Sequence, residues 1–213
     1  MRTLKDNAPV LVIAAVTIIV FVGILLFASR TEQKTDVGSS VDQARFMTEG
    51  THVRGEASAS ATLVEFSDFE CPACGMFYPK ISELEHKYPT SLKVVYKHFP
   101  LPQHTEARKA AEAAEAAGAQ GKFWEMHDKM FENQKALKVE DLKKYAADLG
   151  LDTKKFDEEL DSGKYAAKVQ TDSALGTGLG VNSTPTFYLN GKKIVNLKSL
   201  NSLEDEIRKE LKL

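Results

Sequence analysis

Residues 61–74 read ATLVEFSDFECPAC, and this stretch contains the chain's only two cysteines, Cys71 and Cys74. Its first part, 61–66, is short, apolar and rich in β-forming residues, which predicts a strand. The residues after the cysteines, 75–88, carry apolar side chains at helical spacing. The cysteines therefore lie where a strand gives way to a helix.

Three kinds of site use a Cys-x-x-Cys pair. A zinc site needs four ligands, but the chain has no further cysteine, and His98 and His104 lie far from Cys74 in the sequence. A structural disulfide that closes so small a loop would restrict the unfolded chain very little. The third kind is a redox pair that exchanges disulfides with other thiols, and the local sequence favours it over the other two.

The start of a helix is a suitable place for redox cysteines. Pro72 fits an early helical position, where its missing N–H is not needed. The free N–H groups and the helix dipole stabilise negative charge there, so Cys71 is expected to be partly thiolate near neutral pH. Cys74 follows three residues later on the same helix face, within disulfide range. We therefore expect an exposed, activated Cys71 and a sheltered Cys74, the combination that thiol–disulfide exchange requires.

Further strands follow at 92–99, 186–189 and 192–195, where apolar and β-forming residues are concentrated. The first of these completes a strand–helix–strand unit with 61–66, which is typical of a parallel pair. The other two flank Asn190-Gly191, the strongest short signal for a hairpin turn. The sequence therefore predicts a mixed sheet of about four strands.

A block of helices separates the second strand from the third. Its segments show apolar side chains at helical spacing, at 104–119, 123–133, 139–149, 153–160 and 165–179. A last helix follows Ser199 or Ser202, either of which can cap it. The chain is thus expected to form an α/β core with an all-helical insertion at about 104–180.

An uncharged apolar run at 9–28 precedes this domain. As a helix it would span roughly 30 Å, the thickness of the hydrocarbon core of a bilayer. The run is long for a cleaved signal peptide, and bulky residues stand at the plausible cleavage points. The sequence predicts a short flank (1–8), a transmembrane anchor (9–28), a polar tether (29–50) and a folded domain (51–213). Basic residues are balanced across the run, so charge does not decide its orientation.

Four motifs together resemble the DsbA-like thiol–disulfide oxidoreductases of the thioredoxin superfamily, in their membrane-anchored bacterial form. They stand in the family's order and read ATLVEFSDFECPAC (61–74), KHFPLPQHTEARKAAEAA (97–114), GKFWEMHDKMF (121–131) and GVNSTPTFYLNGK (180–192). The resemblance covers residues 51–213. It implies a thioredoxin fold with a helical insertion between the second strand and the strand after Thr184-Pro185.

The resemblance also implies roles for individual residues. Cys71 is expected to be the nucleophile and Cys74 the resolving cysteine of a redox-active disulfide, with Pro72 and Ala73 as the dipeptide between them. The Thr184–Pro185 bond is expected to be cis and to form a substrate-binding loop that faces the cysteines. A proline at this position could also simply begin a strand.

Glu65 and three histidines complete the set of candidate residues. Glu65 stands six positions before Cys71, where the family carries an acid, and it could relay a proton to or from Cys74. The alternative is a carboxylate that faces solvent. His98, His104 and His127 are interpreted as structural.

One feature departs from the strongly oxidising members of the family, which often carry a histidine between the cysteines. Here that residue is Ala73, and the carboxylates of Asp68 and Glu70 stand just upstream. Both carboxylates oppose a thiolate, although exposed charges act weakly. We predict that Cys71 is less acidic, and its disulfide less oxidising, than in a Cys-Pro-His-Cys protein.

The resemblance implies an enzyme that forms disulfides in exported proteins and needs no metal or organic cofactor. It would lie on the outer side of the cytoplasmic membrane, act on unfolded or reduced exported proteins, and be reoxidised by a membrane partner similar to DsbB or to vitamin K epoxide reductase. The formal net charge of −2 offers no basic excess for nucleic acid. The alternatives are a reductase or isomerase of the same fold, and a tethered binding module with an inert disulfide.

Overall fold

The computed structural model describes residues 40–195, 197 and 199–213. The anchor predicted at 9–28, the flank at 1–8 and the first part of the tether lie outside the described residues. Within the described part of the chain, no helix is both long enough and apolar enough to cross a membrane.

A mixed sheet of five strands forms the centre of the domain, in the order β1-β3-β2-β4-β5. The strands are β1 (His52–Arg54), β2 (Ala61–Ser67), β3 (Leu92–His98), β4 (Thr186–Leu189) and β5 (Lys192–Lys193). The central strand β2 pairs in parallel with β3 and antiparallel with β4. In this register Glu65 lies between Tyr96 and Phe187. Every residue of β2 is buried, as a strand covered on both faces requires.

The sheet has one strand more than the sequence predicted. The additional strand β1 has only three residues and pairs antiparallel with the outer edge of β3. A segment that short shows no recognisable alternation of apolar and polar residues. The predicted hairpin is present, with positive φ at Asn190 and Gly191, but β5 ends at Lys193 instead of continuing to 195.

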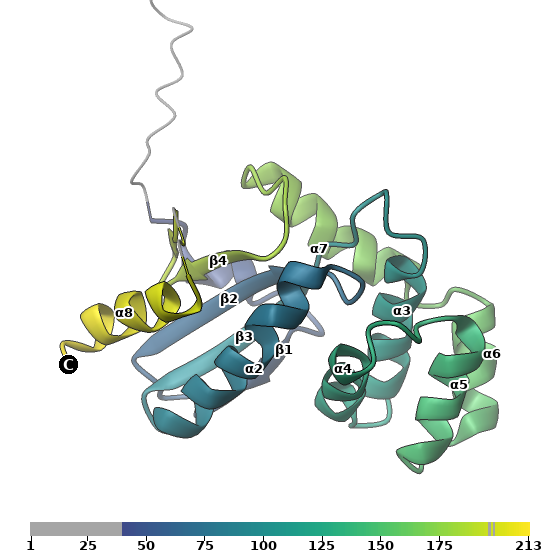
Figure 1. Ribbon diagram of the computed structural model, residues 1–213. Coiled ribbons are helices and arrows are strands. Elements are labelled where there is room, and N and C mark those ends of the chain that lie inside the picture. The colour runs from purple at the N-terminus through teal and green to yellow at the C-terminus, as the bar shows by residue number, and fades with distance from the viewer. Residues whose placement is uncertain (1–39, 196, 198) are drawn as a thin grey trace, which may run out of the picture. The chain divides into compact units, whose positions relative to one another are not determined.

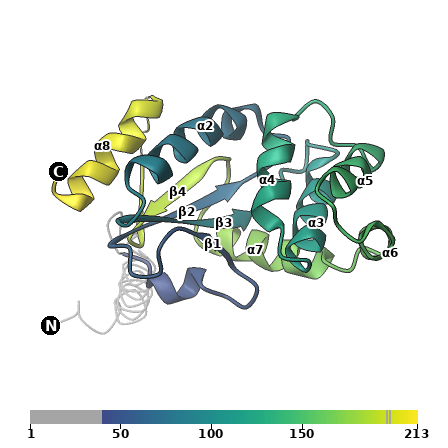
Figure 2. The same ribbon diagram turned by 90° about the horizontal axis from the view of Figure 1, so that it is seen from below.

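Helices cover both faces of the sheet (Figures 1 and 2). On one face, α2 (Pro72–Lys87) and α8 (Leu200–Leu211) pack against β2, β3 and β4. Ser199 caps α8 by accepting a hydrogen bond from the Ser202 N–H. The 3₁₀ helix η1 (Gln43–Phe46) and the end of α7 lie on the other face.

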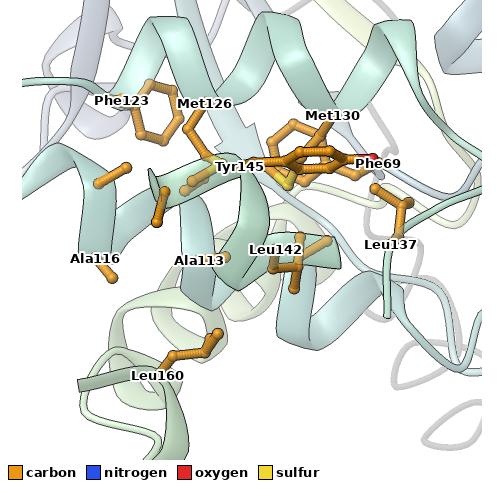
Figure 3. Close-up of a cluster of buried hydrophobic side chains, with 14 of the residues drawn as sticks. Phe69, Ala113, Ala116, Phe123, Met126, Met130, Leu137, Leu142, Tyr145 and Leu160 are labelled. Atoms are coloured by element: carbon orange, nitrogen blue, oxygen red, sulfur yellow. The ribbon is translucent and has the colours of Figure 1, made fainter. Parts of the chain in front are cut away.

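The helical insertion between β3 and β4 has its own apolar core. It consists of α3 (Ala107–Gly118), α4 (Phe123–Glu132), α5 (Val139–Asp148), α6 (Thr153–Asp161) and α7 (Ala166–Gly178). The helical insertion predicted from the sequence is therefore confirmed. Figure 3 shows Phe69, which comes from the segment before Cys71, among the side chains of this core. The insertion thus packs directly against the chain segment that carries the cysteines.

The compact unit begins at Ser40, earlier than the start near residue 51 that the sequence suggested. Phe46 is only 1% exposed and packs against Phe66 and Tyr188. The Val41 N–H donates to the carbonyl of Gly191. A single aromatic residue in a polar segment has no periodicity, which is why the sequence placed this stretch in the tether.

Candidate active site

Cys71 and Cys74 lie at the point where β2 has ended and α2 begins. Cys71 is the N-cap residue of α2 and Pro72 occupies its first turn, as the sequence predicted. The Cys71 N–H donates to the carbonyl of Asp68, so the connecting segment forms a tight turn. Both cysteines are free thiols in the structure.

The exposure of the two thiols differs less than the sequence suggested. Cys74 is fully buried, but Cys71 is also only 6% exposed, so the expectation of an exposed Cys71 is wrong. Thr184 covers it: the Cys71 thiol donates to the Thr184 carbonyl oxygen over 3.4 Å. The distinction between the two cysteines therefore lies in their ionisation.

The Thr184–Pro185 peptide bond is cis, the conformation that the resemblance implied. This loop directly precedes β4, which pairs with the strand that leads to Cys71. The hydroxyl of Thr184 is buried and has no hydrogen-bond partner among the described residues. It is therefore free to donate to the Cys71 sulfur once that thiol has ionised.

The pKa of Cys71 is lowered to about 5. A hydrogen bond from Cys74 is the largest cause, and it outweighs the opposing effect of burial. The Thr184 side chain and the backbone N–H groups of Ala73 and Cys74, which can donate to the ionised sulfur, lower the pKa further. At neutral pH Cys71 is thus a thiolate, which is the nucleophilic form of a cysteine.

The pKa of Cys74 is shifted in the opposite direction, far above the ordinary value of a thiol. Burial is the main cause, followed by the hydrogen bond to Cys71 and the negative charge of Glu65. Cys74 therefore stays protonated while Cys71 ionises. One activated thiol beside one protonated thiol can make and break a disulfide in two steps.

Glu65 lies beneath this pair in β2 and is 3% exposed, which excludes the alternative of a solvent-facing carboxylate. Burial raises its pKa to about 7, although a hydrogen bond of 2.7 Å from the Ser67 hydroxyl acts to lower it. A carboxyl group with this pKa exchanges its proton readily near neutral pH. The role of Glu65 as a proton relay for Cys74 remains a prediction.

A small pocket opens beside Glu65, between the sheet and the insertion. Polar and aromatic side chains dominate its lining, which comprises Arg54, Glu65, Tyr78, Ile81, Val94, Trp124, His127 and Phe131. Arg54 is held there by Glu85 and Asp128 at distances of 2.7 and 2.9 Å. The pocket gives the otherwise buried carboxyl group of Glu65 a polar neighbourhood through which a proton can arrive.

The sequence suggested that Asp68 and Glu70 lie free beside the thiolate, but they do not. The buried Asp68 carboxylate accepts hydrogen bonds from the Leu101 N–H and from His104 Nδ1, at 2.8 and 2.7 Å. The Glu70 carboxylate accepts hydrogen bonds from the N–H of Glu106, just before α3, and from the N–H of Ala107, the first residue of α3. These bonds hold residues 101–106 in turns, so α3 begins at Ala107 and not at the predicted residue 104.

The histidines have acidic partners. Burial opposes the protonation of His104, but the hydrogen bond to Asp68 and the negative charges of Asp68, Cys71 and Glu70 together outweigh it and raise the His104 pKa. Burial lowers the pKa of His127 to about 4, although its ring bonds to Asp128. His98 bonds to Glu115 over 3.0 Å.

A second cluster of potential metal ligands lies away from the cysteines, where His98, Glu115 and Asp172 bring their ligand atoms within 4.8 Å of one another. The two oxygens of Asp172 already bond to Lys97 and Lys168, at 3.1 and 2.8 Å. Both oxygens of Glu115 are likewise engaged by histidines. Because lysine ammonium groups neutralise these carboxylates, the cluster is an ion-pair network that joins the sheet to the insertion.

The thioredoxin family model matches residues 47–209, which include the sheet, the cysteines and the insertion. The chain belongs to the thioredoxin family. The solved structures that resemble it include BdbD from Bacillus subtilis. That structure is 28% identical, with a TM-score of 0.70 over 77% of this chain and 94% of BdbD.

Two further solved structures share this fold. A thioredoxin-like oxidoreductase from Silicibacter pomeroyi is 25% identical, with a TM-score of 0.70 over 80% of this chain and 98% of its own. The thiol-disulfide exchange protein alpha-DsbA2 from Wolbachia pipientis has a TM-score of 0.68 over 78% of this chain and 90% of its own. At 19% identity, the Wolbachia protein supports the fold alone.

The curated relatives of this chain are named as Na(+)/H(+) antiporters. A Na(+)/H(+) antiporter NhaA 3 from Salinispora tropica is 45% identical over 143 residues, which are 67% of this chain and 22% of the antiporter. A Na(+)/H(+) antiporter NhaA from Herminiimonas arsenicoxydans is 36% identical over 90% of this chain and 31% of its own length. The chain thus spans between about a fifth and a third of these relatives. A match of 143 residues is longer than the part of the chain before residue 47, so most of it falls on the thioredoxin domain.

Several residues of the site were not predicted from the sequence. Arg54 lies in the unpredicted strand β1, and Ser67 is an ordinary strand residue until its bond to Glu65 is known. Gln134 comes from the insertion, yet its side-chain amide donates to the carbonyl oxygens of Phe69 and Cys71. No local pattern marks Arg54 and Gln134, because each acts on a segment distant in the sequence.

Proposed function

We propose that this protein is a thiol–disulfide oxidoreductase that forms disulfide bonds in exported proteins, with Cys71 as the nucleophile and Cys74 as the resolving cysteine. The observation that carries the proposal is the opposite ionisation of two adjacent thiols beside the Thr184–Pro185 loop. A purely structural disulfide needs no such difference. The thioredoxin-like oxidoreductase from Silicibacter pomeroyi among its structural neighbours supports the same class of enzyme.

In the oxidising direction the enzyme begins as the Cys71–Cys74 disulfide. A client thiolate attacks the sulfur of Cys71 and forms a mixed disulfide, and Cys74 leaves with the electron pair of the broken S–S bond. Cys74 takes up a proton, because burial raises its pKa, and Glu65 with its pKa of about 7 can supply one.

A second client thiolate then attacks the client sulfur of the mixed disulfide. The client leaves with a new disulfide, and Cys71 leaves as a thiolate. The low pKa of Cys71 favours this step, because a thiol of low pKa is a good leaving group. The enzyme has gained the two electrons that the client has lost.

The cis loop provides the surface for the client in this proposal. The Thr184 carbonyl already accepts a hydrogen bond from the Cys71 thiol, so the loop backbone lies against the reacting sulfur. An extended client segment could pair with this backbone as an added strand, with its own sulfur next to Cys71. Thr184 and Pro185 are therefore proposed as substrate-binding residues.

The proposed setting is the outer side of the cytoplasmic membrane, with residues 9–28 as the anchor. Newly formed disulfides persist only in an oxidising compartment. A membrane partner similar to DsbB or to vitamin K epoxide reductase would remove the electrons from the reduced pair. The antiport activity named for the curated relatives is no part of the proposal, because the match spans 31% or less of each of the two relatives compared above.

The test follows the oxidation of a reduced, unfolded client protein by the oxidised enzyme and by its Cys71→Ser variant. We expect the variant to be inactive. Unchanged client oxidation by Cys71→Ser would leave a binding module with an inert disulfide as the function.

The direction of electron flow is tested by equilibrating the pair with glutathione. A reduction potential well above that of the glutathione pool, which is about −240 mV, is expected for an oxidase. A potential near that of thioredoxin, about −270 mV, would overturn the oxidising direction and favour a reductase.

A further inference from the structure

Gln134 connects the helical insertion to the turn that carries the reactive cysteine. It follows the end of α4, and its side-chain nitrogen Nε2 donates two hydrogen bonds across the interface. One goes to the carbonyl oxygen of Phe69 at 2.8 Å and the other to the carbonyl oxygen of Cys71 at 2.9 Å. A single side chain thus bonds to both ends of the segment that positions the Cys71 sulfur.

The space that this amide fills exists because residue 75 is glycine. A Cβ atom at Gly75 would lie 2.5 Å from Cδ of Gln134, and closer still to its Oε1. Glycine is unfavourable inside a helix compared with alanine, and here it directly follows Cys74 in the second turn of α2. The close approach of Gln134 gives this unfavourable choice a physical reason.

The carbonyl groups that Gln134 engages belong to the turn that stabilises the thiolate. The backbone N–H groups of Ala73 and Cys74 bond to the Cys71 sulfur and help to lower its pKa. Their direction depends on the conformation of the peptide units before them. The Phe69 carbonyl precedes the helix and has no partner in the helical ladder, so without Gln134 this carbonyl would lose its hydrogen bond to the insertion.

We infer that Gln134 is a positioning residue, seated against Gly75, through which the helical insertion sets the acidity of Cys71. Its two donated hydrogen bonds hold the turn in the conformation that aims the backbone N–H groups at the sulfur. They also offset the partial negative charge of the Cys71 carbonyl beside the thiolate. The consequence for redox chemistry rests on the proposed function, whereas the effect on Cys71 ionisation stands without it.

The first experiment compares Gln134→Ala with the matched variant Gln120→Ala in the full chain. Gln120 lies in the same insertion and also bonds to backbone groups, those of Asp152, but away from the cysteines. The ionisation of Cys71 is followed by thiolate absorbance during a pH titration. Gln134→Ala should weaken the ionisation constant of Cys71 by about threefold to tenfold, the effect of one lost hydrogen bond, and Gln120→Ala should leave it unchanged.

The same two variants are equilibrated with glutathione, in which the protein disulfide and two glutathione molecules form the protein dithiol and oxidised glutathione. Loss of thiolate stabilisation disfavours the dithiol, so Gln134→Ala should be less oxidising by a similar factor. Urea unfolding of the variants separates this effect from general destabilisation. Equal effects of the two substitutions on acidity, or no effect of Gln134→Ala, would overturn the inference.

Gly75→Ala provides an independent test that keeps Gln134 in the sequence. Alanine favours the helix, but its Cβ would expel the Gln134 amide, so the acidity of Cys71 should fall as it does in Gln134→Ala. In the double variant the obstructing side chain is gone, and Gly75→Ala should add no further change. Additive effects on Cys71 would contradict the seating of Gln134 against Gly75. Inactivity towards clients with these shifts intact would refute the proposed function alone.

Discussion

Replacement of Glu65 by glutamine should remove a pH-dependent penalty from the folded protein. Burial raises the pKa of Glu65 from an ordinary 4.5 to about 7. The folded protein therefore binds this proton more tightly than the unfolded chain does. The stability that results is complete below pH 4.5 and is lost as the pH rises through 7. This proton contributes about 3 kcal/mol to the unfolding free energy at low pH, and the whole contribution is lost at high pH.

The measurement is urea unfolding of the reduced wild type and of Glu65→Gln, from about pH 4 to about pH 8.5. Glutamine can still accept the hydrogen bond from Ser67 but carries no charge. We expect the difference in unfolding free energy between the variant and the wild type to change by about 3 kcal/mol in favour of the variant from the low to the high end of this pH range. The difference between the two proteins cancels the titration of Cys71 and His104. A difference that does not change with pH would refute the raised pKa of Glu65. Glu56→Gln is the control, because it removes an exposed carboxyl group.

Three further outcomes are expected. The thiolate absorbance of Cys71 should titrate with a midpoint of about pH 5, whereas a midpoint near the ordinary value of about 8.5 would show that the thiol is not activated. Given a client that contains a disulfide, Cys74→Ser should accumulate a mixed disulfide, visible on non-reducing gels, because Cys71 attacks the client disulfide, one client sulfur leaves as a thiolate, and no resolving thiol remains to release the other; free enzyme and free client only would contradict this role. Gly176→Ala should lower stability by about 1–3 kcal/mol, since its Cβ would lie 2.7 Å from Phe99. Gly178→Ala, with open space around it, is the control, and equal losses of Tm in the two variants would rule out the clash.

The segments predicted from the sequence are those in which local pattern and tertiary environment agree. The strand that ends at Ser67 is mostly apolar and is buried throughout because both of its faces are covered. The insertion helices α3 to α6 show apolar periodicity because each buries apolar side chains in a shared core. Asn190-Gly191 specifies its turn through backbone conformation alone.

The elements that the sequence did not reveal depend on distant partners. Strand β1 exists because β3 offers an edge, and Phe46 is buried because Phe66 and Tyr188 leave a site for it. The start of α3 is delayed because the Glu70 side chain satisfies N–H groups that a longer helix would otherwise have used. Interactions between residues more than 30 positions apart leave no periodic signal in a single sequence.

The candidate site shows the same division. The two cysteines and the cis proline stand in short motifs, so their juxtaposition could be expected from the sequence. The carboxylates of Asp68 and Glu70 were misjudged as free charges, because their partners Leu101, His104 and Glu106 belong to a loop after the next strand. Charge near a thiolate can be judged only when it is known which hydrogen bonds already hold it.

The alanine between the cysteines makes the surroundings of the pair more important for its chemistry. Ala73 brings no charge or side-chain donor to the thiolate, so the low pKa of Cys71 depends on Cys74, Thr184 and the backbone N–H groups. Groups of this kind stabilise a charge only while they are held in place. The insertion does this through Gln134, and the loop before α3 does it through Asp68. The acidity of Cys71 should therefore respond to changes outside the Cys-Pro-Ala-Cys motif more strongly than in a protein whose motif supplies its own histidine.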